Sequence, residues 1–205
     1  MLNLHVRPAV SRVVDPIAAA LLRAGVSPDA ITLLGTLGAV AGALVFFPRG
    51  SFVIGSAVVA LSVLTDLLDG AMARRRGTTS AFGAWLDSTC DRVADAAIFS
   101  GLVLWFTGGG DNRLLAAVAL FCLVSGSIVS YAKARAEGLG LRADVGLAER
   151  AERLILVLLG TALAGFGVEV ALAVLLWVLA AASAITVVQR LVEVRRQAAL
   201  AGPAG

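Results

Sequence analysis

Long apolar stretches, separated by short polar breaks, dominate the chain from residue 27 onward. Six stretches are predicted to be membrane-spanning helices, at residues 30–47, 51–73, 82–106, 113–136, 151–167 and 168–193. Each is close to the about 17–25 residues that a helix needs to cross a bilayer. Turn-forming and charged residues interrupt them, such as Pro48-Arg49-Gly50. The pattern predicts an all-α integral membrane protein, in which the short loops make spans two and three, and spans five and six, antiparallel neighbours.

The first 26 residues have a different pattern, in which apolar and basic positions alternate. Pro8, Asp15 and Pro16 interrupt any long apolar run, so we expect an amphipathic helix that lies on the membrane. Ser27-Pro28-Asp29 then marks the start of the first span. The predicted organisation is an interfacial segment at 1–26, a six-helix membrane domain at 27–193 and a tail at 194–205.

Composition supports this class. Of the 205 residues, 59% are hydrophobic and 15% are charged, and the mean hydropathy is +0.92. A soluble domain has roughly 45–50% apolar and about 25% charged residues. These values exclude a disordered chain or a disulfide scaffold and argue against a soluble enzyme. Because six spans use most of the chain, any chemistry must lie within the spans or at their ends.

Basic residues are distributed unevenly between the two ends of the predicted spans. Of the 17 Lys and Arg, only Arg49 and Arg113 fall on one side and Arg92 lies inside the third span. All the others fall on the side of the chain termini. This bias places both termini in the cytoplasm of a multi-pass protein of the plasma membrane. It also accounts for the net charge of +3, and no nucleic-acid partner is expected.

Five aspartates occur within two of the apolar runs, where a carboxylate costs at least a few kcal/mol unless it is paired, protonated or bound to a cation. They are Asp66, Asp69, Asp87, Asp91 and Asp95. Residues three or four apart share a helix face, so the acids of each run project together. Hard oxygen ligands suit Mg²⁺ or Mn²⁺, and two divalent ions would neutralise four carboxylates. The alternative is a structural network with Arg74, Arg75, Arg76 and Arg92.

The spacing of these acids resembles a known signature. The matching residues are Asp66, Asp69, Gly70, Ala73, Arg74, Gly83, Asp87 and Asp91. Together they resemble the signature of the CDP-alcohol phosphotransferase family, whose members transfer a phosphate-linked group from a CDP-linked donor to an alcohol and release CMP. The resemblance implies that Asp66, Asp69, Asp87 and Asp91 bind two Mg²⁺ ions, with Mn²⁺ as the other candidate. It also implies that Asp91 is the catalytic base, although a role as a metal ligand alone stays open.

The same resemblance implies a site for CDP-diacylglycerol. Its expected residues are Asp29, Ala30, Ile31, Thr32, Gly70, Ala73, Arg74 and Ser80. Arg74 can offer a forked donor to phosphate, and a helix N-terminus favours anions. The alternative is that Ser27, Asp29 and Ser80 only cap helices.

Basic residues near the later spans predict a pocket for a phosphorylated polyol. We expect it to contain Ser130, Lys133, Arg135, Arg153 and Arg190. The alternative for each cation is orientation of the protein and contact with anionic lipid. Within the family, the chain resembles actinobacterial members that use 1D-myo-inositol 3-phosphate, in the stretches 27–35, 66–95, 131–137 and 146–153. Glycerol 3-phosphate would fit almost equally well by charge alone, and the resemblance also implies a homodimer.

A divalent-cation transporter is an alternative of a different class. It would need acids near the middle of the membrane and an open route to both faces. Here the acids lie beside the basic loop that begins at Arg74. This position favours an enzyme with its site at the cytoplasmic surface.

Overall fold

The computed structural model describes residues 14–77 and 80–201, and within them all regular structure is helical. Residues 14–23 form a helical segment. The elements that follow are α2 (Pro28–Phe46), the 3₁₀ turn η1 (Phe47–Arg49), α3 (Phe52–Arg76), α4 (Ala81–Thr107), α5 (Arg113–Glu137), α6 (Arg150–Gly165) and α7 (Glu169–Ala201). Each of the six predicted runs corresponds to one long helix, and α7 continues past residue 193.

Serine side chains start two of these helices. The Ser27 hydroxyl accepts from the backbone N–H of Ala30 at 3.2 Å, with Pro28 in the first turn. The Ser80 hydroxyl accepts from the N–H of Gly83 at 2.9 Å. Capping satisfies N–H groups that have no partner within the helix. The capping roles considered for both serines are therefore confirmed.

Among residues 14–77 and 80–201, four helices are long and apolar enough to cross a membrane: Pro28–Arg49, Phe52–Arg76, Arg113–Glu137 and Glu169–Leu200. α4 has 27 residues, but Asp87, Asp91, Arg92 and Asp95 reduce its apolar character. α6 has only 16 residues, which span about 24 Å at about 1.5 Å per residue, less than the about 30 Å of a hydrocarbon core. The chain is thus a multi-pass membrane protein in which α4 and α6 depart from the simple apolar pattern.

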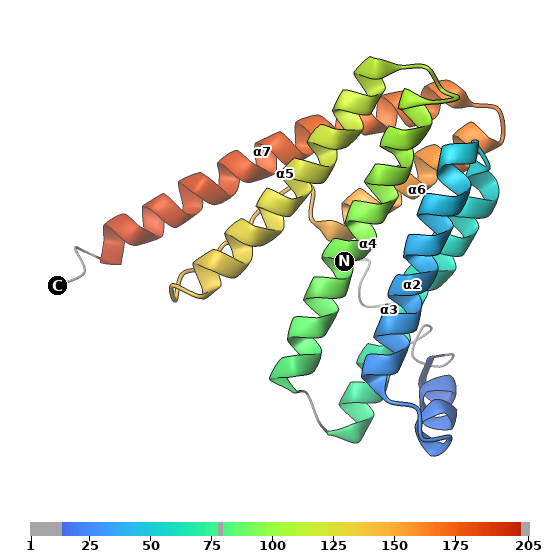
Figure 1. The fold of residues 1–205 in the computed structure, drawn as a ribbon. Coiled ribbons are helices and arrows are strands. Elements are labelled where there is room, and N and C mark those ends of the chain that lie inside the picture. Colours follow the sequence, from blue (N-terminus) through green and yellow to red (C-terminus); the bar gives the residue numbers. More distant parts are fainter. Residues whose placement is uncertain (1–13, 78–79, 202–205) are drawn as a thin grey trace.

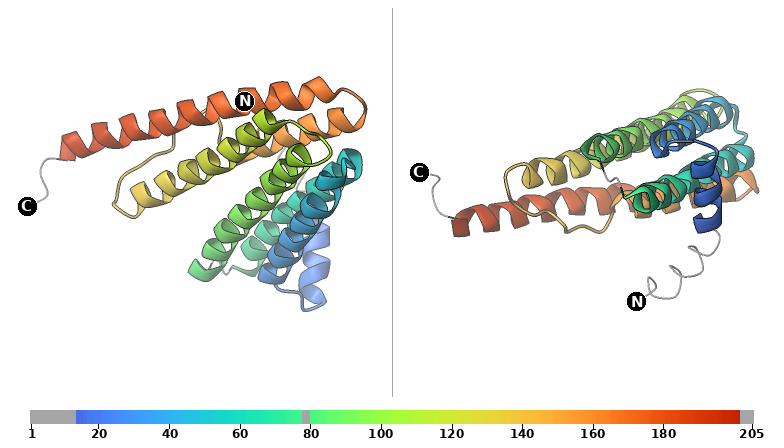
Figure 2. Two further views of the ribbon diagram at one scale, coloured as in Figure 1. Left: turned by 45° about the horizontal axis from the view of Figure 1, so that its top comes forward. Right: turned by 90° about the horizontal axis from the view of Figure 1, so that it is seen from below.

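The helices form two layers. α4 lies between α2 and α5 in one layer, and α6 lies between α3 and α7 in the other. Two contacts, α2 with α3 and α5 with α7, join the layers. α5 and α7 diverge from α2, α3 and α4 toward the ends at Glu137 and Ala201 (Figures 1 and 2). The functional residues described below lie near the wider end of this arrangement.

One neighbour relation predicted from the sequence is wrong. α6 and α7 pack together as expected, but α3 and α4 make almost no direct packing contact, because α2 packs against both. Glycines on α2 allow this close approach. A Cβ at Gly38 would lie 2.4 Å from the Ser62 hydroxyl, and one at Gly42 would lie 2.8 Å from Val58. These glycines therefore serve helix packing within one chain.

The helical segment 14–23 packs against the Arg76 end of α3. Ala18 is fully buried with Ala71 and Met72, and Leu21 and Ile31 cover this small cluster. The segment thus places part of its apolar face against the protein. The first half of the predicted interfacial segment, residues 1–13, lies outside the described residues.

Candidate active site

A cavity of about 510 Å³ lies between α2, α3, α4 and the first residue of α6. It holds three of the signature aspartates, Asp66, Asp69 and Asp87, although α3 and α4 do not pack against each other. The other lining residues are Ser27, Pro28, Asp29, Thr32, Gly70, Ala73, Arg74, Arg76, Ser80, Gly83, Ala84 and Arg150. The acidic faces of α3 and α4 therefore lie on the same cavity but do not pack against each other.

The carboxylates in this region have different partners. Asp69 is buried and accepts a hydrogen bond of 2.5 Å from the hydroxyl of Thr32 on α2. Asp87 is exposed and makes no ion pair with any residue from 14 to 77 or from 80 to 201. Asp66 and Asp91 are partly buried and are both bound by one arginine. The site thus contains both neutralised and unpaired carboxylates.

That arginine is Arg150, which was not among the residues predicted from the sequence to form a site. It is the first residue of α6. Its Nη1 lies 3.1 Å from Asp66 Oδ2, and its Nη2 lies 2.8 Å from Asp91 Oδ1. One guanidinium therefore connects α3 with α4. One signal in the sequence could have indicated its position. Arg150 precedes Arg153 by three residues, so both lie on the same face of the helix as a residue already predicted to bind a ligand.

The donor set suits a divalent cation in its chemistry but not in its present geometry. Within the described residues, no three acidic, histidine or cysteine side chains are close enough to hold one ion. Arg150 occupies the space between Asp66 and Asp91. The donor chemistry does fit, because Asp69 and Asp87 face the same cavity with carboxylate oxygens that hard cations prefer. The predicted metal site thus has suitable carboxylate oxygens, and the Arg150 guanidinium binds two of its four aspartates.

Most residues expected to hold the nucleotide also line this cavity. Asp29, Thr32, Gly70, Ala73, Arg74 and Ser80 all do so. Two glycines leave room there. A Cβ at Gly70 would lie 3.3 Å from Arg74 Nη1, and one at Gly83 would lie 3.1 Å from Ser80 Oγ and 3.6 Å from Asp29 Oδ1. Ala30 and Ile31 are not among the lining residues, and Ile31 packs on the cluster of segment 14–23.

The five residues predicted to bind the acceptor phosphate do not line this cavity. Arg153 is 1% exposed, and its Nη2 lies 2.8 Å from Asp95 Oδ2. Arg190 is 2% exposed, and its Nη2 lies 2.9 Å from Glu149 Oε1. Both guanidinium groups thus already have carboxylate partners inside the protein.

The other three residues lie on α5. Lys133 Nζ lies 2.7 Å from Asp144 Oδ1, and this hydrogen bond and charge hold the pKa of Asp144 below its ordinary value. The Ser130 hydroxyl donates to the carbonyl of Gly126 at 3.1 Å. Arg135 is exposed and forms no ion pair with a described residue. Arg135 and Lys133 are the more accessible cations of the set.

The loop between α5 and α6 is held by buried groups on α7. Thr186 Oγ1 accepts from the backbone N–H groups of Leu147 and Ala148, each at 3.0 Å. Arg190 donates to the carbonyl of Val145 at 2.9 Å. Because this loop leads directly into Arg150, α7 helps to fix the position of the arginine that binds the acids.

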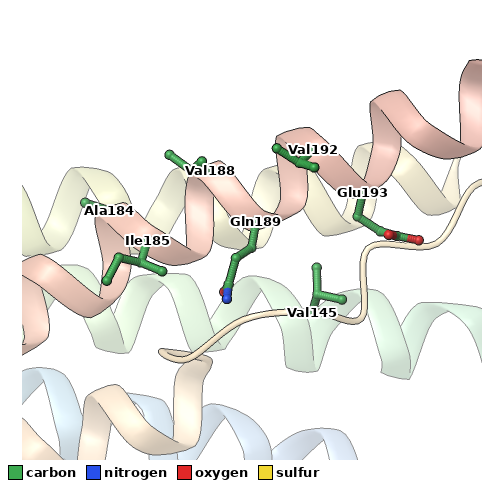
Figure 3. Close-up of a pocket in the computed structure, with 7 residues that line it drawn as sticks. All are labelled: Val145, Ala184, Ile185, Val188, Gln189, Val192 and Glu193. Carbon is green, nitrogen blue, oxygen red and sulfur yellow. The ribbon is translucent and has the colours of Figure 1, made fainter.

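A second cavity of about 570 Å³ lies elsewhere, between α7 and Val145 (Figure 3). Its lining is mainly aliphatic, with Val188 and Val192 among the side chains, and Gln189 and Glu193 are its polar members. None of the signature aspartates lines it. The candidate chemistry therefore belongs to the smaller, polar cavity.

The model of the family described as CDP-alcohol phosphatidyltransferase matches residues 25–188 of this chain. This span contains every residue of the cavity and all the long helices except the end of α7. The chain belongs to this family. The family membership predicted from the aspartate signature is confirmed, and the chain is an enzyme of the phosphatidyltransferase class.

Similar proteins come from several bacteria. The chain is 54% identical over 211 residues to phosphatidylinositol phosphate synthase of Streptomyces avermitilis, covering 100% of this chain and 86% of that protein. It is 51% identical over 188 residues to phosphatidylinositol phosphate synthase of Mycobacterium tuberculosis, covering 90% of this chain and 87% of that protein.

Two crystal structures of the Mycobacterium tuberculosis protein are also similar. The structure with CDP-DAG bound has a TM-score of 0.86 at 51% identity and covers 89% of this chain and 94% of that one. The structure in complex with manganese and citrate has a TM-score of 0.85 and covers 88% of each chain. The similarity thus extends over the whole helical arrangement that forms the cavity.

Proposed function

We propose that this chain transfers the phosphatidyl group of CDP-diacylglycerol to 1D-myo-inositol 3-phosphate and releases CMP. The observation that carries the proposal is the placement of seven of the eight signature residues around one cavity of about 510 Å³. The eighth, Asp91, does not line this cavity and is linked to it through Arg150. Relatives about half identical over nearly the whole chain are named phosphatidylinositol phosphate synthase, and one was crystallised with CDP-DAG.

The cavity residues suggest how the donor would be held. Arg74 and the N-terminus of α4, capped by Ser80, offer donors to the diphosphate. Asp29 can accept from the amino group of the cytosine ring. Gly70 and Gly83 leave space beside Arg74 and Asp29, respectively. Ala30 and Ile31 would then support the segment rather than contact the nucleotide.

Asp91 is the proposed base. It would take the proton of the acceptor hydroxyl while that oxygen forms a bond to the β-phosphorus of the donor. The bond between the β-phosphorus and the oxygen bridging to the α-phosphorus breaks, and CMP leaves with that oxygen. Asp91 is partly buried near the cavity. Partial exclusion of solvent limits the access of bulk water that would compete with the acceptor hydroxyl.

Asp66, Asp69, Asp87 and Asp91 are the proposed ligands of two divalent ions, Mg²⁺ or Mn²⁺. A similar protein was crystallised with manganese. Such ions supply charge neutralisation of the diphosphate and of the leaving group. Thr32 would position Asp69 through its short hydrogen bond.

We propose that the acceptor phosphate is bound by one serine and four basic residues: Ser130, Lys133, Arg135, Arg153 and Arg190. Lys133 and Arg135 are accessible, whereas Arg153 and Arg190 would have to share or leave their present carboxylate partners. A phosphate dianion can compete for such groups because guanidinium binds phosphate in the same forked manner as carboxylate.

We also infer the placement of the protein. All six long helices would cross the plasma membrane, with both termini and the active site on the cytoplasmic side and residues 1–26 as an interfacial helix. The charged residues of α4 line the cavity or form ion pairs, which reduces their cost in a bilayer. A homodimer is the proposed assembly.

The test is a transfer assay with the full chain in lipid nanodiscs. We expect labelled inositol phosphate to enter lipid, with equimolar CMP release, only when Mg²⁺ or Mn²⁺ is present. Asp91→Asn should abolish both signals, and a control on α7 that does not line the active-site cavity, Glu193→Gln, should leave them unchanged. Turnover with glycerol 3-phosphate but not with inositol phosphate would contradict the proposed acceptor.

A further inference from the structure

Arg150 has the most unusual position of any charged side chain in this site. It begins α6, which packs against α3 and α7, yet its guanidinium binds acids of both α3 and α4. The side chain is about one quarter exposed. It lines the same cavity as the proposed nucleotide residues. Its role is therefore tied to the carboxylates rather than to helix packing or membrane orientation.

The other arginines near the cavity do not share this arrangement. Arg74 forms no ion pair with a described residue, and Arg153 binds Asp95, outside the signature. Arg92 lies 3.8 Å from Asp91 at a different oxygen, Oδ2. Arg150 alone, among the described residues, is paired with two of the four proposed metal ligands.

We propose that Arg150 is an exchangeable internal counter-ion of the metal site. Its guanidinium neutralises Asp66 and Asp91 when the carboxylates hold no cation and must release them when divalent ions bind. This inference rests on the proposed metal ligands of the preceding section.

The proposal follows from charge and geometry. Four carboxylates near one cavity repel one another, and a partly buried carboxylate without a partner is costly. A planar guanidinium can bind two carboxylates at once, which an ammonium group does less well. Since the described acids do not converge on one point while Arg150 lies between them, cation binding and arginine binding compete for the same oxygens.

Competition makes a definite prediction about metal affinity. Removing the guanidinium should strengthen divalent-cation binding, because the ions no longer have to displace it. We expect the Kd for Mn²⁺ to fall about tenfold in Arg150→Gln, at the low end of what charge-assisted hydrogen bonds contribute. The metal-free variant should melt at a lower temperature than the metal-free wild type, and saturating Mn²⁺ should remove most of this difference.

The experiment measures free Mn²⁺ by electron paramagnetic resonance during titration of the purified full chain in nanodiscs. Arg150→Lys keeps the charge but loses the fork, so its Kd should lie between those of wild type and Arg150→Gln. Arg142→Gln is the matched control, because it removes one exposed arginine of the preceding loop that contacts none of the aspartates. Thermal melts with Mn²⁺ establish that each variant is folded.

Tighter Mn²⁺ binding in Arg150→Gln, with an unchanged control, supports the counter-ion. An equal or weaker affinity would overturn it and indicate that Arg150 orients the ligands in the metal-bound state. If Arg150→Gln fails to fold, Arg150→Lys decides, and an affinity no tighter than wild type overturns the inference. Absence of Mn²⁺ binding to the wild type would instead refute the metal site itself, a result distinguishable from a failure of the counter-ion alone.

Discussion

The buried ion pair between Asp95 and Arg153 offers a quantitative test of how the active-site helices are held together. Arg153 Nη2 lies 2.8 Å from Asp95 Oδ2, and the two side chains are 1% and 10% exposed, respectively. The pair joins α4 to α6, two helices that belong to different layers. Gly126 provides the space, since a Cβ there would lie 3.0 Å from Arg153 Nε.

The perturbation is Asp95→Ala. It would leave a buried guanidinium without its carboxylate, which costs about 3–5 kcal/mol when one partner of a buried pair is removed. Replacing both residues, with Asp95→Ala and Arg153→Met together, removes this unpaired charge. Arg92 and Arg150, which also approach Asp95, keep Asp91 as a partner. We therefore expect the double variant to be more stable than the sum of the two single changes implies.

The assay is equilibrium unfolding in mixed micelles with increasing SDS, followed by tryptophan fluorescence and circular dichroism. The wild type, the two single variants and the double variant form a double-mutant cycle. Arg196→Ala is the control, because Arg196 lies at a similar distance of 2.8 Å from Glu193 but is 66% exposed. Removal of this surface pair should leave the unfolding midpoint almost unchanged.

An additive cycle would refute this reasoning. If the free energies of the single variants sum to that of the double variant within about 0.5 kcal/mol, the two groups are not energetically coupled. A loss of less than about 1 kcal/mol in Asp95→Ala would likewise contradict the burial argument.

Two further variants test the donor site and the loop. Gly83→Val should raise the KM for CDP-diacylglycerol several-fold with little effect on the KM for inositol phosphate, because its side chain would press on Ser80 and enter the space next to Asp29; an unchanged donor KM in steady-state kinetics would contradict this. Thr186→Val removes the acceptor shared by the N–H groups of Leu147 and Ala148. It should cost about 1–3 kcal/mol and speed hydrogen exchange at these two amides, whereas unchanged exchange would show that they have other partners.

Local properties of the chain were predictable because they depend on residues close in sequence. Apolar run length located six long helices, and Ser27 and Ser80 begin two of them as caps. The eight-residue signature that runs from Asp66 to Asp91 predicted the family, which the family match confirms.

The same reasoning failed where helix neighbours had to be chosen. Short loops predicted that α3 and α4 pack together, but α2 lies against both. The glycines of α2 were visible in the sequence, yet their partner helix was not. Loop length limits how far apart two helix ends can be, whereas close packing depends on complementary surfaces along the whole helices.

The sequence alone thus determined the long helices and the enzyme family, since helix periodicity, apolar length and the spacing of a signature are local properties. Only the tertiary structure decided which charges are paired. Arg150 meets Asp66 across 84 positions of the chain, and Arg153 meets Asp95 across 58. Such pairs form where separate helices bring charges together in a medium that solvates them poorly, so their identity depends on packing rather than on spacing.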